Sequence, residues 1–194
     1  LVAWHNAVLD AQSLISAGRL DEARLRLESV LAADPHNPAA LSLLGMLLFA
    51  KGERAEGLAR LQGAARAAPG VYQNQRNLAN ALQVAGLLDE SARAWRAAIA
   101  LRPGTGEDHY ALGNVLSAQG NARGAIEEYL EALKLGPPSA GLRAALGVTY
   151  AAAGEMAGAR RELGRAVRED PNLAGAWIAL GGLDERSSRW EPAR

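Results

Sequence analysis

The chain has 194 residues, of which 49% are hydrophobic and 22% charged, as in an ordinary globular protein. Lys plus Arg and Asp plus Glu both number 21, so no excess of charge favours nucleic acid or an anionic membrane surface as a partner. The lack of cysteine excludes disulfides and thiolate metal sites, and no apolar run approaches the roughly 18 residues of a membrane span.

Taken in chain order, apolar residues at helical spacing predict a series of helix pairs. The pairs are expected over residues 4–17 and 20–33, 38–51 and 54–67, 72–85 and 88–101, 106–119 and 122–135, and 140–153 and 156–169. A further helix is expected over residues 174–186, and its partner near residue 190. Because the chain begins without Met and stops soon after that point, we expect both ends to be cut from a longer chain.

The turns between these helices recur at one fixed spacing along the sequence, which equals the number of residues from Gly18 to Gly52. Glycines and prolines each recur at this interval, at Gly18, Gly52, Gly86, Gly120 and Gly154, and at Pro35, Pro69, Pro103, Pro137 and Pro171. The glycines predict left-handed caps after the first helix of each pair, and the prolines end the second helix. Asn37, Thr105 and Ser139 are predicted N-caps, whereas Val71 offers no capping side chain. A fixed period of this length indicates a repeat array.

Small residues form two further columns with the same period. They are Gly45, Ala79, Gly113, Gly147 and Gly181 on the first helices, and Ala23, Gly57, Ser91, Ala125 and Ala159 on the second. Larger residues follow one turn later, at Leu27, Leu61, Trp95, Tyr129 and Leu163. Close approach of the two helices is predicted at the small residues, and the larger ones fill the remaining space.

Leu112-Gly113, Gly120, Ala125, Tyr129, Ala132 and Pro137 together resemble the signature of the tetratricopeptide repeat family. The resemblance covers residues 4–171 and continues through Trp177, Leu180 and Gly181. It implies an all-α fold, a right-handed superhelical solenoid of antiparallel helix hairpins. It also implies one array over residues 1–194, with full repeats at 4–37, 38–71, 72–105, 106–139 and 140–173 and a partial sixth at 174–194.

The same resemblance implies a concave groove, lined by the first helices, that binds an extended protein or peptide segment. Its apolar part is expected at Leu43, Met46 and Phe49, near Val8, Leu9 and Ile15, and its polar part at Gln73, Arg76, Asn77, Asn80, Gln83, Tyr110 and Asn114. In the fifth repeat, Gly141, Ala144, Ala145 and Val148 predict a shallow wall with few features. The carboxylate clamp of chaperone-binding members is excluded, because Arg76 and Asn80 are followed by Ala111, Gly141 and Ala145 at the later clamp positions.

The amides are the most informative side chains of this groove. Each carries a donor and an acceptor, so Asn77, Asn80 and Asn114 can bind the backbone of a ligand without reading its side chains. The alternative is that some of them cap or bridge adjacent helices. The apolar part has alternatives too: a ligand covers Met46 and Phe49, residues outside the chain or a neighbouring molecule cover them, or Leu9 and Leu43 turn into the core.

Nothing in the sequence predicts catalysis, a metal site or a cofactor within these residues. His5, His36 and His109 lie in distant repeats without a second ligand at metal spacing. Arg160, Arg161, Arg165 and Arg168 interleave with Glu155, Glu162 and Glu169, which predicts a solvated, salt-bridged helix face.

Two functions therefore remain. The first is a scaffold that binds a protein or peptide, with self-association through exposed array ends as an option. The second is a recruiting arm of a larger enzyme of the glycosyltransferase, sulfotransferase or hydroxylase type, whose catalytic domain lies outside this chain. The absence of cysteine fits a cytoplasmic protein and also a periplasmic one.

Overall fold

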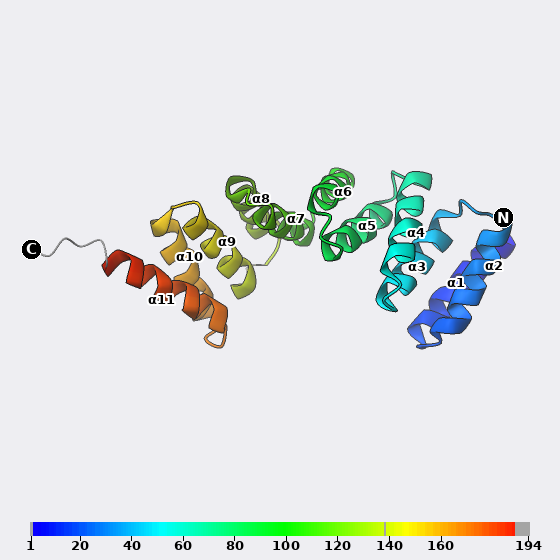
Figure 1. Ribbon diagram of the computed structural model, residues 1–194, viewed down its shortest axis with the longest axis horizontal. Helices are drawn as coiled ribbons and strands as arrows, with labels where there is room; N and C mark the ends of the chain where they lie inside the picture. The colour runs from blue at the N-terminus through cyan, green and yellow to red at the C-terminus, as the bar shows by residue number, and fades with distance from the viewer. Residues whose placement is uncertain (1, 138, 189–194) are drawn as a thin grey trace, which may run out of the picture. The chain divides into compact units, whose positions relative to one another are not determined.

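A computed structural model describes the backbone of residues 2–137 and 139–188 and the side chains of residues 6–137 and 139–183. These residues form helices and no strand (Figure 1). The helices are α1 (Val2–Ser16), α2 (Leu20–Ala33), α3 (Pro38–Ala50), α4 (Arg54–Ala67), α5 (Tyr72–Val84), α6 (Leu88–Leu101), α7 (Gly106–Ala118), α8 (Ala122–Leu135), α9 (Ala140–Ala152), α10 (Met156–Glu169) and α11 (Ala174–Ser188). The all-α prediction is confirmed, and every predicted helix boundary within the described residues is met to within two residues. The helix expected near residue 190 lies outside them.

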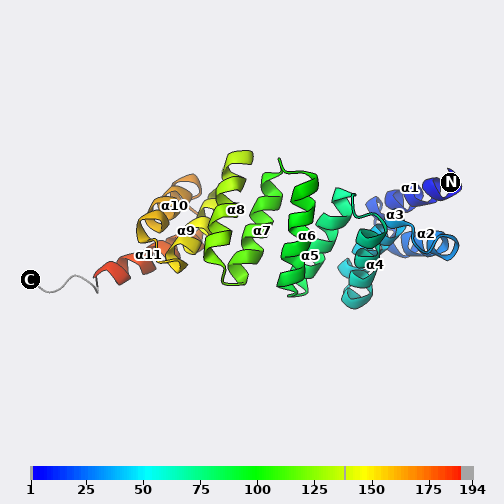
Figure 2. The ribbon, with the colours of Figure 1, turned by 90° about the horizontal axis from the view of Figure 1, so that it is seen from above.

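The chain divides into two compact units, Leu1–Arg102 and Pro103–Arg194. In the first unit, α1 with α2, α3 with α4, and α5 with α6 form antiparallel hairpins (Figure 2). In the second unit, α7 pairs with α8 and α9 with α10, while α11 packs against α10 and α9. Within each unit the first helices of successive hairpins also contact one another: α3 contacts α5, and α7 contacts α9. This arrangement of tandem hairpins is the predicted one.

The five glycines of the turns all have positive φ, between 74° and 89°. At Gly120, with φ of 78°, the Gly120 N–H donates to the Ser117 carbonyl and the next N–H, from Asn121, donates to the Leu116 carbonyl. These bonds satisfy carbonyls that the end of α7 would otherwise leave unpaired. An L side chain is strained at this φ, which explains why glycine recurs there.

The predicted N-caps are confirmed at two positions and wrong at one. Asn37 Oδ1 accepts from the Ala40 N–H at 3.0 Å, and Ser139 Oγ accepts from the Leu142 N–H at 3.2 Å. Thr105 precedes α7, but its side chain makes no cap hydrogen bond, because the N–H of Asp108 already donates to the Thr105 backbone carbonyl at 3.1 Å.

Because of this difference, two otherwise similar substitutions should have different effects. We expect Asn37→Ala to lower the free energy of unfolding by about 1 kcal/mol, since it leaves a helix N–H without its acceptor. Thr105→Ala removes no such bond and should change it by less than about 0.5 kcal/mol. Urea denaturation followed by circular dichroism measures both. Equal losses in the two variants would contradict the cap assignment.

At Gly45 and Gly113 the small residues make the close helix contacts that were predicted, whereas a Cβ built on Gly181 would meet no atom within 4 Å among the described residues. A Cβ built on Gly45 would lie 2.8 Å from Leu61 Cγ, and one built on Gly113 would lie 2.5 Å from Tyr129 Cε1. In each case the large residue of the second helix lies directly over the glycine of the first. Leu27, Leu44 and Leu48 are fully buried within the core of the first unit.

One structural column was not predicted from the sequence. Gln75, His109 and Trp177 occupy the same position in different repeats, and each places a side-chain nitrogen against the carbonyl of the proline six positions earlier. The distances to the oxygens of Pro69, Pro103 and Pro171 are 3.1, 3.3 and 3.0 Å. His109 Nδ1 also lies 2.7 Å from Glu128 Oε2. This histidine therefore joins the start of α7 to the preceding turn and to α8.

Candidate functional site

The first unit has two adjoining hollows along α3 and α5, with one lining residue from α4 in the first and two from α1 in the second. The first, of about 240 Å³, is lined by Met46, Phe49, Ala50, Leu61, Asn77, Asn80, Ala81 and Val84. The second, of about 460 Å³, is lined by Val8, Gln12, Pro38, Ala39, Ser42, Leu43, Met46, Val71, Gln73, Asn74 and Asn77. Both include Met46 and Asn77, so they adjoin. We call them together the α3–α5 groove.

Apolar and amide side chains face each other across this groove. The sequence places them in different repeats, as an apolar stretch followed by a polar one. Met46 and Asn80, however, have the same position in successive repeats, and α3 packs beside α5. The side chains of the two repeats therefore line the same hollow. Met46 is 46% exposed, so this residue is accessible to a ligand.

The amides of the groove are not equivalent. Gln73 Nε2 donates to Asn77 Oδ1 at 2.7 Å, and Asn77 Nδ2 donates to Ser42 Oγ at 3.1 Å. Asn77 is buried, and its hydrogen bond to Ser42 bridges α5 to α3. This corresponds to the alternative from the sequence that some of these amides bridge adjacent helices. Asn80 is exposed and makes no side-chain hydrogen bond among the described residues. Its amide is the one that can bind a ligand without breaking an existing bond.

Asn114 and Tyr110, the other predicted site residues, belong to the second unit. Tyr129 donates its hydroxyl hydrogen to Asn114 Oδ1 at 2.8 Å, and the rings of Tyr110 and Tyr129 are 5.8 Å apart. Burial raises the pKa of Tyr129 to about 12, so the hydroxyl remains a donor at neutral pH. The oxygen of the Asn114 amide is thus engaged within its own hairpin.

The small residues of the fifth repeat line a hollow where the sequence predicted a nearly featureless wall. Its volume is about 340 Å³, and Gly141, Ala144, Ala145 and Val148 line it together with Tyr129 and Thr149. The wall is hollowed because side chains this short leave space between α9 and the start of α11, above the buried Tyr129 ring.

The described lining of the α3–α5 groove is uncharged: among the side chains that the structure describes, neither hollow includes an Asp, Glu, Lys or Arg. Arg76 and Gln83, which the sequence placed in the groove, are not among the lining residues. Sequence reasoning missed Ser42, Gln12 and Val84. Each is four positions from a residue that it had placed in the groove, so continuing by one helical turn along the same face would have found them.

The charged face of α10 differs from the predicted solvated face at one residue. Glu162 is buried and accepts hydrogen bonds from Arg143, Arg161 and Arg165. Burial alone would raise the pKa of the Glu162 carboxyl, but the hydrogen bonds from Arg161 and Arg143 and the charge of Arg165 outweigh it and hold the pKa below its ordinary value. The other charged side chains of this helix are exposed, as predicted.

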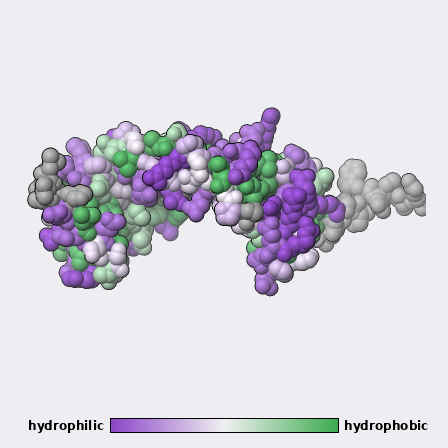
Figure 3. Space-filling model, turned by 180° about the vertical axis from the view of Figure 1, so that it is seen from behind, coloured by the Kyte–Doolittle hydropathy of each residue, from purple (hydrophilic) through white to green (hydrophobic). Residues whose placement is uncertain are grey.

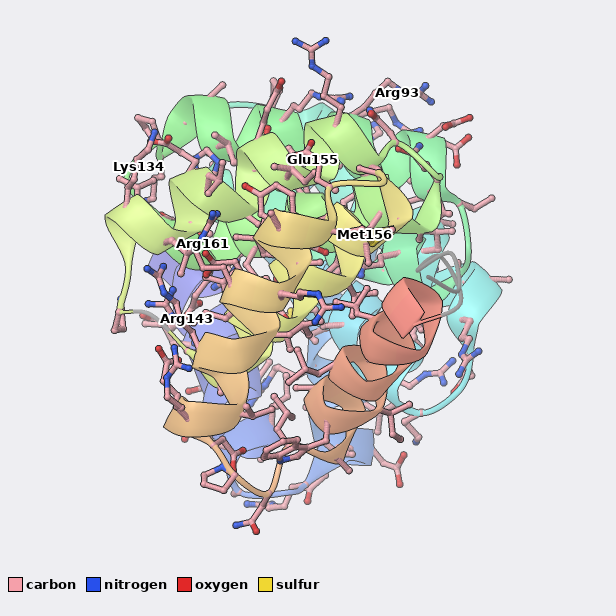
Figure 4. The ribbon with its side chains drawn as sticks, turned by 90° about the vertical axis from the view of Figure 1, so that its left-hand side faces the viewer. Arg93, Lys134, Arg143, Glu155, Met156 and Arg161 are labelled. Carbon is pink, nitrogen blue, oxygen red and sulfur yellow. The ribbon has the colours of Figure 1, made fainter. Side chains whose placement is uncertain are left out.

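Figures 3 and 4 show the region of the second unit around α10. On the face shown in Figure 3, a hydrophilic area lies over part of the region of the second unit that carries α9 to α11. Arg143 of α9 and Arg161 of α10 lie on the same flank of α10, whereas Glu155 and Met156 lie at its start (Figure 4). The pairs around Glu162 therefore connect α9 to α10 in the second unit.

The described residues contain no group of three or more His, Cys, Asp or Glu side chains that could hold a metal ion. None of the helices that the structure describes is long and apolar enough to cross a membrane.

Comparisons with known proteins agree on the fold. Two family models, both described as tetratricopeptide repeat, match residues 14–82 and residues 76–140 and 110–174. No curated protein matches the sequence. Among solved structures, MamA is 20% identical with a TM-score of 0.79, over 100% of this chain and 99% of that one. YrrB, titled a TPR protein with an unusual peptide-binding site, is 21% identical with a TM-score of 0.84 over 89% of both chains. A tetratricopeptide repeat protein from Parabacteroides merdae is 16% identical with a TM-score of 0.81, over 97% of this chain and 75% of that one.

Proposed function

Since the chain belongs to the tetratricopeptide repeat family and has the fold of a protein-interaction scaffold, we propose that its α3–α5 groove binds an extended peptide or partner segment. The observation that carries the proposal is the composition of the groove. An apolar wall formed by the exposed Met46 and the half-buried Phe49 faces Asn80, an amide whose donors and acceptor are unpaired among the described residues. One wall suits apolar side chains and the other suits a peptide backbone.

Two further features support a preformed site. The Gln73–Asn77–Ser42 chain holds the floor of the groove by hydrogen bonds between α5 and α3. Gly45 and Leu61 pack in direct contact beneath the first hollow and hold α3 against α4. A groove held in this way loses little conformational entropy when a ligand binds. YrrB, which has a similar fold, carries a peptide-binding site, and this supports a peptide as the ligand.

The site is tested by selecting binders from a random peptide library against the full chain. The selected peptides are then measured by fluorescence anisotropy with the parent protein and its variants. We expect Met46→Glu to weaken binding at least tenfold, about 1.4 kcal/mol, because it places a charge in an uncharged apolar hollow. Asn80→Ala should weaken it about fivefold, since it removes one backbone contact.

Two matched controls accompany these variants. Met156→Glu changes a methionine of similar exposure, 38% against 46%, on α10 of the second unit. Asn172→Ala removes an exposed amide in the turn before α11. Both should leave the affinity unchanged. Selected peptides that bind Met46→Glu as tightly as the parent would place the binding site elsewhere and overturn the proposal.

A further inference from the structure

The two hollows of the α3–α5 groove follow each other along the helices. The first uses residues 46–50 of α3 and 77–84 of α5, and the second uses residues 38–46 and 71–77. Their centres are thus displaced by about six residues along both helices. With a rise of about 1.5 Å per residue, they lie about 9 Å apart along the helix axes. A single ligand that fills both hollows must carry apolar side chains at this separation on one face.

This separation discriminates between backbone conformations. In a β-strand, side chains on one face lie about 6.7 Å apart at i, i+2 and about 13 Å apart at i, i+4, so neither spacing fits. A polyproline II helix has three residues per turn and rises about 3.1 Å per residue, which places residues i and i+3 on one face about 9.3 Å apart. An α-helix also reaches about 10.5 Å, at i, i+7.

The hydrogen-bonding groups of the groove separate the last two options. The donors and acceptor of Asn80 are unpaired among the described residues, and they need backbone groups that a ligand has left free. An α-helix satisfies its own backbone along its length, whereas polyproline II forms no internal hydrogen bonds and keeps its carbonyls available. The lining residues that the structure describes also include no charged side chain that could pair with a ligand charge.

We propose that the α3–α5 groove recognises an uncharged segment in the polyproline II conformation with apolar side chains three positions apart. One of these side chains enters the hollow at Met46, Phe49 and Val84, and the other enters the hollow at Val8 and Leu43. Asn80 bonds the backbone between them or next to them. This inference rests on the proposed function, because it specifies the ligand of the same groove.

Three labelled peptides with identical uncharged flanks test the inference against the full chain. The first contains Leu-Pro-Pro-Leu, the second has the isomeric order Leu-Pro-Leu-Pro, and the third is an alanine-rich helix with two leucines seven positions apart. We expect the first to bind at least tenfold more tightly than the others in fluorescence anisotropy, a difference of about 1.4 kcal/mol. Met46→Glu should abolish that preference, and Met156→Glu should leave it intact.

The possible outcomes distinguish failure of the polyproline II inference from failure of the proposed peptide groove. If the second or third peptide binds as tightly as the first and remains sensitive to Met46→Glu, the polyproline II spacing is wrong and the peptide groove stands. If none of the three binds while a library-selected peptide does so in a Met46-dependent way, the spacing is again wrong. If no peptide of either kind responds to Met46→Glu, both proposals fail.

Discussion

Replacing Gly57 by alanine should lower the free energy of unfolding by about 2 kcal/mol, the cost of overpacking a tight helix contact. A Cβ at this position would lie 2.7 Å from the backbone nitrogen of Phe49 and 2.8 Å from the carbonyl oxygen of Gly45. Neither atom can move without shifting α3, so the cost falls in the range of about 1–3 kcal/mol or more. It exceeds the gain of about 1 kcal/mol that alanine brings to a helix interior.

Gly63 on the same helix provides the matched control. A Cβ there would contact only the flexible end of Leu41, at 3.4 Å. Gly63→Ala should therefore raise the free energy of unfolding by up to about 1 kcal/mol. Urea denaturation of the full chain measures both variants. If Gly57→Ala were as stable as the parent, the close approach of α3 and α4 would be wrong.

The same substitution also bears on the groove. Gly57 contacts the backbone of Phe49, and Phe49 lines the first hollow. Displacing α3 at this point changes the shape of the hollow although Gly57 does not line it. Gly57→Ala should consequently weaken peptide binding under conditions where the protein remains folded.

Glu162→Gln is expected to have the second large effect, a loss of about 2 kcal/mol at neutral pH, because it breaks a buried set of ion pairs. The glutamine keeps the shape of the side chain but removes the negative charge shared by Arg143, Arg161 and Arg165. Breaking a fully buried pair costs about 3–5 kcal/mol. We expect less here because Arg161 and Arg165 are about half exposed and Arg143 retains its contact with Glu169.

The pH dependence of this loss follows from the pKa of Glu162. Its pKa in the folded protein is lower than its ordinary value of 4.5, so the folded state binds the proton less readily than the unfolded state does. The stabilisation is complete above that ordinary value and is lost as pH falls through the lower, folded-state pKa. The difference in stability between the parent and Glu162→Gln should therefore be largest at neutral pH and shrink in acid.

Glu127→Gln is the control for this variant. Glu127 pairs with Arg123 at 3.4 Å on an exposed helix face, where the side chains are 67% and 93% exposed. Its loss should be below about 0.5 kcal/mol and should be screened by salt. Similar losses for Glu162→Gln and Glu127→Gln would contradict a special role for the buried carboxylate.

Much of the fold could be predicted because each determinant is local. The turn at Gly120 needs a residue that tolerates positive φ, and the column of Gly45 and Gly113 needs residues without bulk. Both requirements recur with the period of the repeat, so each further copy supports the same prediction of the turn and of the close helix contact. Thr105 was assigned wrongly because the choice between a side-chain cap and a backbone carbonyl depends on the exact dihedral angles at the helix start.

The candidate site was predictable residue by residue but not as an arrangement. Met46, Phe49 and Asn80 follow from their places on the first helices. Their convergence on one hollow depends on the packing of α3 beside α5, and so does the engagement of Asn77 by Ser42. Similarly, the alternation of arginine and glutamate on α10 does not show that Glu162 is the residue turned into the α9–α10 contact.

By itself, then, the sequence determined the helices, their turns and the repeat, since backbone conformation and helix periodicity depend on neighbours along the chain. Only the tertiary structure decided which side chains remain free to bind. An amide or a carboxylate has the same chemistry in any repeat, and its partner comes from a helix far away in sequence: Ser42 pairs with Asn77, whereas Asn80 remains available. The separation of the two hollows along α3 and α5, on which the polyproline II inference depends, was likewise set by helix packing.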